Sequence, residues 1–274
     1  LVGLVPLKSL LDAGRYFLQK QQRSTGVSEN ELIKIAIKTM GLDELGPFKP
    51  EERIIEYLLK DKADSKLVSM TLTDFADETA SESPAPGGGS ISAYVGSLGI
   101  SLATMVANLS SHKKGWDARW EEFSVWAEKG QKIKDELTKL VDLDTLAFNK
   151  IMTAFSLPKG TDEEKAARKQ AIQDATKFAI EVPFKVMQLS YDSLTIIKAM
   201  AEVGNPNSVS DAGVGALCAR SAVMGAFMNV RINASGYDDK TFVTDIIAKG
   251  KDIENKTIAL EADILKIVNE KIGV

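Results

Sequence analysis

The stretch Ser83-Pro84-Ala85-Pro86-Gly87-Gly88-Gly89-Ser90 leads directly into a run of small residues, Ile91-Ser92-Ala93-Tyr94-Val95-Gly96-Ser97. Two prolines stiffen the approach, and three glycines allow positive φ and remove every side chain. Ser90 is predicted to cap a long helix that continues to Leu109. A bare backbone at a helix N-terminus suits an anionic or polar ligand, whereas a plain linker is the alternative interpretation of the same residues.

The composition restricts the classes of protein to consider. With 274 residues, of which 44% are hydrophobic, the chain can form one large or two smaller globular domains. A net charge of −4 gives no reason to expect nucleic acid as a partner. Cys218 and His112 are the only residues of their kinds, so we expect no intramolecular disulfide, no zinc site and no other metal.

The same counts predict where the protein works. A single cysteine fits a reducing compartment, and we therefore expect a cytoplasmic location. No run reaches about 18 consecutive apolar residues, which predicts a soluble protein with no membrane partner. Because the chain begins at Leu1 rather than at methionine, we also expect a truncated or processed start.

Helical spacing of apolar residues dominates the chain, and it predicts an all-α fold, a multi-helix up-and-down bundle. Residues 1–60 are predicted to form short helices, with Ser28 and Pro50 at two of their starts. A polar run follows, and residues 61–69 are interpreted as a linker. The helices expected in the remaining part, 70–274, are 72–80, 90–109, 117–140, 142–155, one from Thr161 that ends near Pro183, 191–203, 210–234 and 238–271.

Two of these helices carry a stripe of small and polar residues. A step of about 100° per residue places five residues on the same face as Ser90: Tyr94, Ser97, Ser101, Thr104 and Asn108. The apolar side of that helix consists of Leu98, Leu102, Met105, Val106 and Leu109. The later stripe comprises Asp211, Gly215, Cys218, Ala222, Gly225, Asn229 and Asn233, and Ser210 and Asp211 are predicted to cap its helix. Close helix packing explains either stripe alone, but two such stripes favour a ligand groove.

Asp144 is the residue that points to chemistry. It lies within an apolar stripe made of Ile133, Leu137, Leu140, Phe148, Ile151 and Phe155, if one helix runs through all of them. Burial disfavours an ionised carboxylate, so the pKa of Asp144 should rise unless the group is paired. A carboxyl with a raised pKa suits general acid–base work near neutral pH. The alternative is a helix break between residues 140 and 142, with Asp144 as a first-turn residue or cap.

Several motifs follow one another along the chain: Pro84-x-Pro86-Gly87-Gly88-Gly89-Ser90, Met105-Val106-Ala107-Asn108-Leu109, Val141-Asp142-x-Asp144-x-x-Ala147-Phe148, Val182-Pro183, Gly204-Asn205, Ser210-Asp211 and Asn229-Val230-x-Ile232-Asn233. In this order they resemble the cyclodeaminase domain of formiminotransferase-cyclodeaminase, over residues 70–274. Leu1–Leu7 and the stretch from Gly41 to Leu58 carry a second resemblance. Through them residues 1–60 are similar to the C-terminal part of the formiminotransferase domain.

The resemblance implies a reaction and a set of roles. The implied substrate is 5-formiminotetrahydrofolate from histidine degradation, and the implied products are 5,10-methenyltetrahydrofolate and ammonia. Asp144 matches the catalytic aspartate of the family, where it would shuttle protons. Folate would be the substrate itself, so that no separate cofactor is expected. The residues implied to bind the pterin and the formimino group are Gly87, Gly88, Gly89, Ser90, Asn108, Ser210, Asp211, Asn229 and Asn233.

The resemblance also implies a homodimer in which long helices pack together, with the site at the dimer interface, and it leaves room for a higher oligomer and for polyglutamylated folate. Most of the transferase, including its catalytic histidine, has no counterpart in this sequence, so transferase activity is not expected. Two alternatives stay open. One is a methenyltetrahydrofolate cyclohydrolase of the same fold, and the other is a non-catalytic helical oligomerisation module.

Overall fold

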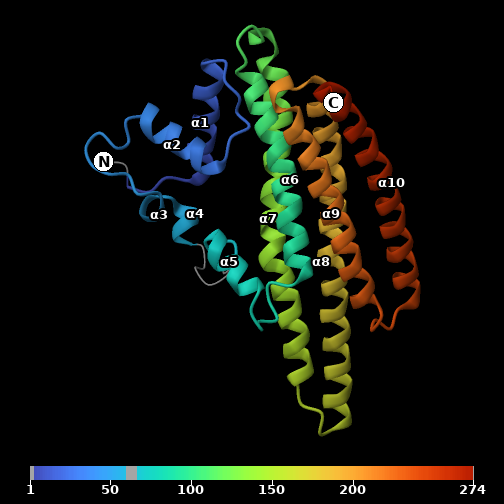
Figure 1. Cartoon of the computed structure of the whole chain (residues 1–274). Coiled ribbons are helices and arrows are strands. Elements are labelled where there is room, and N and C mark those ends of the chain that lie inside the picture. Colours follow the sequence, from blue (N-terminus) through green and yellow to red (C-terminus); the bar gives the residue numbers. More distant parts are fainter. Residues whose placement is uncertain (1–2, 60–66, 274) are drawn as a thin grey trace.

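The computed structural model describes residues 3–59 and 67–273, and it places a small N-terminal lobe beside a long helical bundle (Figure 1). The lobe contains α1 (Leu7–Lys20), α2 (Glu29–Thr39), α3 (Pro50–Arg53) and α4 (Ile55–Leu58). The Ser28 hydroxyl accepts a hydrogen bond from the amide of Glu31, and Pro50 opens α3, as predicted. Most of the predicted linker, up to residue 66, lies outside the described residues.

The remaining helices form the bundle, which confirms the predicted all-α class. After the short α5 (Leu72–Thr79) come α6 (Gly88–Ser111), α7 (Trp120–Ser156), α8 (Asp162–Val203), α9 (Val209–Ala234) and α10 (Lys240–Ile272), with short 3-10 turns at Asp117–Arg119 and Pro206–Ser208. Each of the long helices packs against the next one in the chain, and α6 also packs against α8 and α9 (Figure 1). Over residues 3–59 and 67–273 the structure has no strand, apart from an isolated bridge between Val5 and Ile54.

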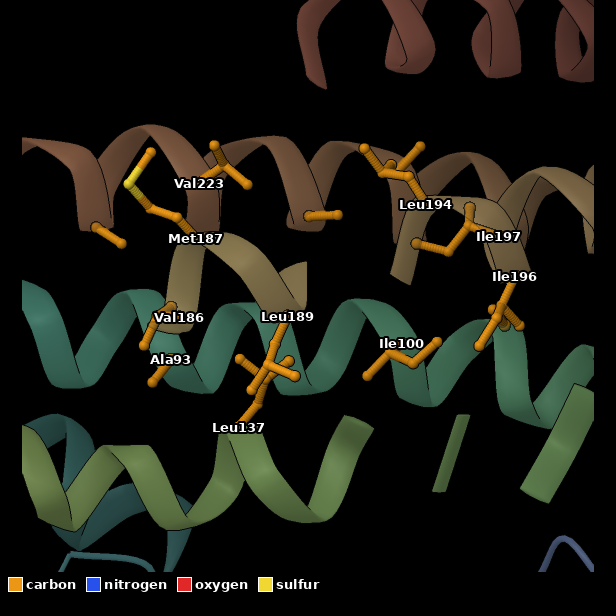
Figure 2. Close-up of a cluster of buried hydrophobic side chains, with 14 of the residues drawn as sticks. Ala93, Ile100, Leu137, Val186, Met187, Leu189, Leu194, Ile196, Ile197 and Val223 are labelled. Carbon is orange, nitrogen blue, oxygen red and sulfur yellow. The ribbon is translucent and has the colours of Figure 1, made fainter. Parts of the chain in front are cut away.

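The core lies between α6, α7, α8 and α9, where aliphatic side chains interdigitate (Figure 2). Ile100, Leu137 and Ile197 are fully buried there. Small residues let α6 and α9 approach closely, because a Cβ added at Gly99 would lie 2.9 Å from the carbonyl oxygen of Gly215. The dense packing fixes the relative register of the helices that carry the candidate site.

The structure excludes one alternative and contradicts one predicted helix end. α7 runs without interruption through residues 120–156, so Asp144 lies in mid-helix and does not cap a second helix. α8 likewise continues from Asp162 to Val203 through Pro183, where the sequence predicts an end. A proline in a helix loses one backbone hydrogen bond. Here Val182, Pro183 and Val186 are buried, so tertiary packing stabilises the helix across the proline.

Two predicted caps are also wrong. α6 begins at Gly88, with Gly87 as its N-cap, so Ser90 is already a helical residue inside the first turn. Ser208 is the N-cap of α9, which places Ser210 and Asp211 in the first turn of that helix. As a result the Ser90 hydroxyl is free to bond a neighbouring helix rather than its own backbone.

The exposure of α6 is the reverse of what its apolar and polar sides suggest. Ser90, Ser97 and Thr104 of the polar stripe are buried, and the Ser97 hydroxyl lies 2.9 Å from the hydroxyl of Thr138 on α7. Most of the apolar side is open instead: Leu98, Met105 and Leu109 are exposed, although Val106 is buried. The small polar residues therefore serve the close α6–α7 contact, and the large apolar residues face outwards.

Candidate active site

The centre of the candidate site is the contact between the start of α6 and the middle of α7. The Ser90 hydroxyl lies 3.1 Å from Oδ2 of Asp144 and donates 2.9 Å to the carbonyl oxygen of Val141. Gly89 faces the same carboxylate, since a Cβ added there would lie 2.5 Å from the carboxyl carbon of Asp144. The glycine loop therefore brings bare backbone against Asp144, which joins two sequence motifs that are 54 residues apart.

The surroundings of Asp144 change its acidity. Burial raises the pKa of Asp144, while hydrogen bonds from the side chain and the backbone of Ser90 act in the opposite direction and do not cancel it. This confirms the direction expected from an aspartate on an apolar helix stripe. A carboxyl with a raised pKa can both accept and return a proton close to neutral pH.

Asn229 of α9 lies beside this centre. A Cβ added at Gly88 would lie 3.3 Å from Nδ2 of Asn229, and that amide nitrogen donates 3.0 Å to Gly225 in its own helix. Asn233 uses its amide nitrogen differently, donating 2.7 Å to the carbonyl oxygen of Ala179 on α8. Of the two asparagines, Asn229 is therefore placed against the glycine loop, whereas Asn233 ties α9 to α8.

Three of the other predicted site residues, Asn108, Ser210 and Asp211, lie towards the opposite end of α6. Asn108 follows Ser90 by 18 residues in one continuous helix, a separation of about 27 Å along the axis. α9 runs antiparallel to α6, with Asn229 near Gly88 and Gly215 near Gly99, so Ser210 and Asp211 lie towards the Asn108 end. Within one chain, Gly88, Gly89, Ser90 and Asn229 thus lie around Asp144, whereas Asn108, Ser210 and Asp211 lie towards the other end of α6.

A cavity of about 330 Å³ opens at the Asn108 end, in the groove between α6 and α7. Its lining residues are Ser101, Thr104, Met105, Asn108, Leu109, His112, Gln131 and Lys134. Gln131 is not among the site residues predicted from the sequence, and no motif contains it. Its contact with Gly26 of the N-terminal lobe depends on how the lobe packs against α7.

The described side chains do not form a metal site. Over residues 3–59 and 67–273, no group of three or more His, Cys, Asp or Glu side chains is arranged to hold a metal ion. Asp144 has a serine hydroxyl and backbone as its neighbours, which is a setting for proton transfer.

Comparisons with known proteins place these features in a family. The model of the formiminotransferase-cyclodeaminase family matches residues 71–252, and that of the formiminotransferase domain matches residues 1–60. The chain is 36% identical over 243 residues to the formimidoyltransferase-cyclodeaminase of Rattus norvegicus, which covers 88% of this chain and 45% of the relative. It therefore spans about half the length of that relative.

Two shorter relatives match about three quarters of this chain and almost all of their own length. The methenyltetrahydrofolate cyclohydrolase of Methylorubrum extorquens is 36% identical over 203 residues, which is 74% of this chain and 98% of that protein. A crystal structure of formiminotetrahydrofolate cyclodeaminase from Thermotoga maritima aligns with a TM-score of 0.67 at 28% identity, covering 76% of this chain and all of that one. The fold, the glycine loop against Asp144 and these matches agree, and the chain belongs to the formiminotransferase-cyclodeaminase family.

Proposed function

We propose that this chain is a formimidoyltetrahydrofolate cyclodeaminase, which converts 5-formiminotetrahydrofolate to 5,10-methenyltetrahydrofolate and ammonia. The observation that carries the proposal is the half-buried Asp144 carboxyl, held by Ser90 against the side-chain-free Gly89. Burial raises the pKa of this carboxyl, which suits a group that must take up a proton and release it again.

The reaction needs one group to move protons between two nitrogens. Attack of N10 on the carbon of the protonated formimino group, N5–CH=NH2+, forms a new C–N bond and turns the iminium nitrogen into a neutral amine on a tetrahedral carbon. Asp144 takes the proton that N10 loses and delivers it to that amine. The bond from the carbon to the protonated amine then breaks, ammonia leaves with the electron pair, and the N5–C–N10 amidinium remains. The folate is the substrate, and this scheme uses no separate cofactor.

A methenyltetrahydrofolate cyclohydrolase is the second candidate, because the relative from Methylorubrum extorquens with that name matches over 98% of its own length. In that reaction water attacks the methenyl carbon, and no ammonia appears. The test gives the wild-type protein each substrate separately and records both methenyltetrahydrofolate absorbance and ammonia. Ammonia formed in step with the methenyl product supports the cyclodeaminase. Loss of methenyl absorbance without ammonia supports the cyclohydrolase, and no change with either substrate favours a non-catalytic module.

The protein is proposed to work as a homodimer in the cytoplasm. Exposed apolar side chains lie along two neighbouring helices, and we call them the α6–α9 face: Leu98, Met105 and Leu109 of α6, and Val214, Leu217, Met228 and Ile232 of α9. Apolar surface of this extent on packed helices is typical of a subunit interface. A second copy of the same chain supplies a matching apolar partner through a two-fold axis.

This face also accounts for the hydropathy of its helices. Gly88–Ser111 and Pro206–Ala234 are long and apolar enough to cross a membrane by length and composition, and 61% and 50% of their most apolar windows are buried in the bundle. Helices that pack in a core on one side and against another subunit on the other reach such values in soluble proteins. We therefore retain the proposal of a protein without a membrane partner.

A further inference from the structure

Ser90 is completely buried, although its hydroxyl lies at the centre of the candidate site. Its relative exposure is 0%, whereas Asp144 beside it is only half-buried. A side chain without accessible surface does not meet a ligand that enters from solvent. Any effect of the Ser90 hydroxyl on the reaction must therefore act through a neighbouring group rather than by contact with the substrate.

The Ser90 hydroxyl has one hydrogen and two acceptors that compete for it. Oδ2 of Asp144 is 3.1 Å away, and the carbonyl oxygen of Val141, one turn earlier on α7, is 2.9 Å away. The hydroxyl of Thr145 is a third neighbour, at 3.4 Å. A rotation about the Cβ–Oγ bond carries the hydrogen from one acceptor to the other without moving any heavier atom.

The charge of Asp144 decides between the two acceptors. An ionised carboxylate forms a stronger hydrogen bond than an amide carbonyl, so it attracts the hydrogen of Ser90. A protonated carboxyl is a weaker acceptor than an amide carbonyl, so the hydrogen then turns to Val141. Because Ser90 has no accessible surface, this second acceptor keeps the buried hydroxyl paired when Asp144 is neutral.

The backbone of Ser90 provides a fixed donor for comparison. Its amide lies in the first turn of α6, where an N–H has no acceptor in its own helix, and it also bonds the carboxylate of Asp144. A fixed N–H favours the ionised form alone, because it has no second acceptor to turn to. The hydroxyl, unlike the amide, can adjust to both forms of the carboxyl.

The other groups around Asp144 are neutral. Burial and the two hydrogen bonds from Ser90 are the causes of the shift in the pKa of Asp144, and no charged side chain in the described part of the chain is among them. Thr145 of α7 and Asn229 of α9, the polar side chains beside this centre, carry no charge. The balance between the two protonation states of Asp144 therefore depends on burial and on Ser90.

We propose that Ser90 is a positioning residue whose hydroxyl turns from Val141 to Asp144 when the carboxyl loses its proton, and turns back when the proton returns. Its part in turnover rests on the proposed function, because Asp144 takes up and releases one proton in each cycle of that reaction. The rotation itself follows from three groups of this chain and needs no substrate. Ser90 thereby supports proton transfer without touching the folate.

Carboxyl NMR measures the contribution of the hydroxyl directly. Labelling of aspartate with ¹³C at the side-chain carboxyl reports the pKa of Asp144, and the Asp144→Asn variant assigns its signal. In Ser90→Ala this pKa should rise by about one unit, because the ionised form loses a donor. Ser92→Ala is the matched control, since this buried serine donates 2.7 Å to Gly88 in its own helix and should leave the pKa unchanged. An unchanged pKa in Ser90→Ala would overturn the proposal.

The pH dependence of turnover separates positioning from a purely structural role. Without the hydroxyl the ionised base is disfavoured, so the acidic limb of kcat should move up by about one pH unit in Ser90→Ala. The KM for the folate substrate should stay within about threefold of wild type, because Ser90 makes no contact with the substrate. A structural role alone would lower turnover without moving the limb, and a substrate contact would raise KM. Either result would overturn the proposal.

Neutron diffraction tests the rotation in the wild-type protein, so its result does not depend on how a variant folds. Deuterium on Oγ of Ser90 should point to Asp144 in crystals kept at least about one pH unit above the pKa found by NMR, and to Val141 in crystals kept equally far below it. The same direction in both crystals would contradict the rotation. If the wild-type protein makes no methenyl product but the deuterium turns as expected, the proposed function fails and the assignment of Ser90 stands.

Discussion

Gly89 and Asp144 are packed so closely that a side chain at position 89 would occupy the place of the carboxylate. The loop glycine thus faces the proposed proton carrier directly, and any Cβ would displace it. Gly89→Ala should therefore lower turnover by at least about 100-fold, because a shift of about 1 Å in a reacting group has that effect. The methenyltetrahydrofolate assay measures the change.

Gly46→Ala is the control for that substitution. Gly46 lies in the N-terminal lobe, and a Cβ there would meet nothing within 4 Å. Its turnover should stay within about threefold of wild type, in keeping with the small effect of an unstrained surface change. Equal losses in the two variants would mean that the loss does not come from the contact between position 89 and Asp144.

Asp144→Asn should stabilise the protein while it removes catalysis. Because burial raises the pKa of Asp144 in the folded protein, ionisation above that pKa costs stability, and a neutral amide avoids this cost. We expect the melting temperature at pH 7 to rise by about 2 °C or more, and turnover to fall by about 10²–10⁴-fold.

The stability gain of Asp144→Asn should depend on pH in a definite direction. The wild-type carboxyl is protonated in both states below its unfolded pKa, so the gain from Asp144→Asn should vanish at low pH and appear as pH rises through the folded pKa. Asp142→Asn is the control, since Asp142 accepts the amide of Leu67 and lies outside the site. A gain that is the same at every pH would contradict a buried, ionising Asp144.

Gly26→Ala should loosen the N-terminal lobe from the bundle. A Cβ at position 26 would lie 2.5 Å from the backbone carbon of Ala127, so the loop must move away from α7. Overpacking of this kind costs about 1–3 kcal/mol. Limited proteolysis should digest the variant faster than wild type, and Gly46→Ala, which has open space around it, should digest like wild type. Unchanged digestion of Gly26→Ala would show that the lobe does not depend on this contact.

Leu217→Glu should disrupt the proposed dimer. Leu217 is 47% exposed in the middle of α9, and a buried charge in an apolar interface is unfavourable. Analytical ultracentrifugation should find a monomer with an unchanged helical circular dichroism spectrum. Leu45→Glu is the control, because Leu45 is 96% exposed on the lobe and lies away from the α6–α9 face. A Leu217→Glu protein with wild-type mass would remove this face from the assembly.

Local chemistry explains which parts of the fold could be predicted from the sequence. Asp239 caps α10 and Thr161 forms a capping box with Glu164, and the ranges predicted from the sequence begin within about two residues of both helix starts. The helix end predicted at Pro183 is wrong because the lost backbone hydrogen bond is a local effect that the sequence shows. The burial of α8 against neighbouring helices, which outweighs that loss, depends on the tertiary structure. The cap at Ser90 was misplaced for a similar reason, since glycine at 87 and 88 already begins the helix.

In the candidate site, too, local features could be predicted and tertiary contacts could not. The raised pKa of Asp144 could be predicted because it follows from the position of one residue on one apolar stripe. The large distance between Asp144 and Asn108 could not be predicted in this way, because the angular position of a residue on a helix does not give its distance along the helix axis. Gln131 and Gly26 were missed for a further reason: their partnership joins residues 105 positions apart and depends on how two parts of the chain dock.

The contacts of Gly26 show that the family boundaries and the packing of this chain do not divide it at the same place. By similarity the chain divides near residues 61–69, where one family model ends and the next begins. In the structure, however, residues before this division cover part of the bundle. The carbonyl of Gly26 accepts hydrogen bonds from Asn108 and Gln131, and Gly26 also packs against Ala127. A polypeptide that starts at residue 70 would keep the whole segment that matches the first family model, yet it would leave the amide nitrogens of Asn108 and Gln131 without the carbonyl that accepts from them.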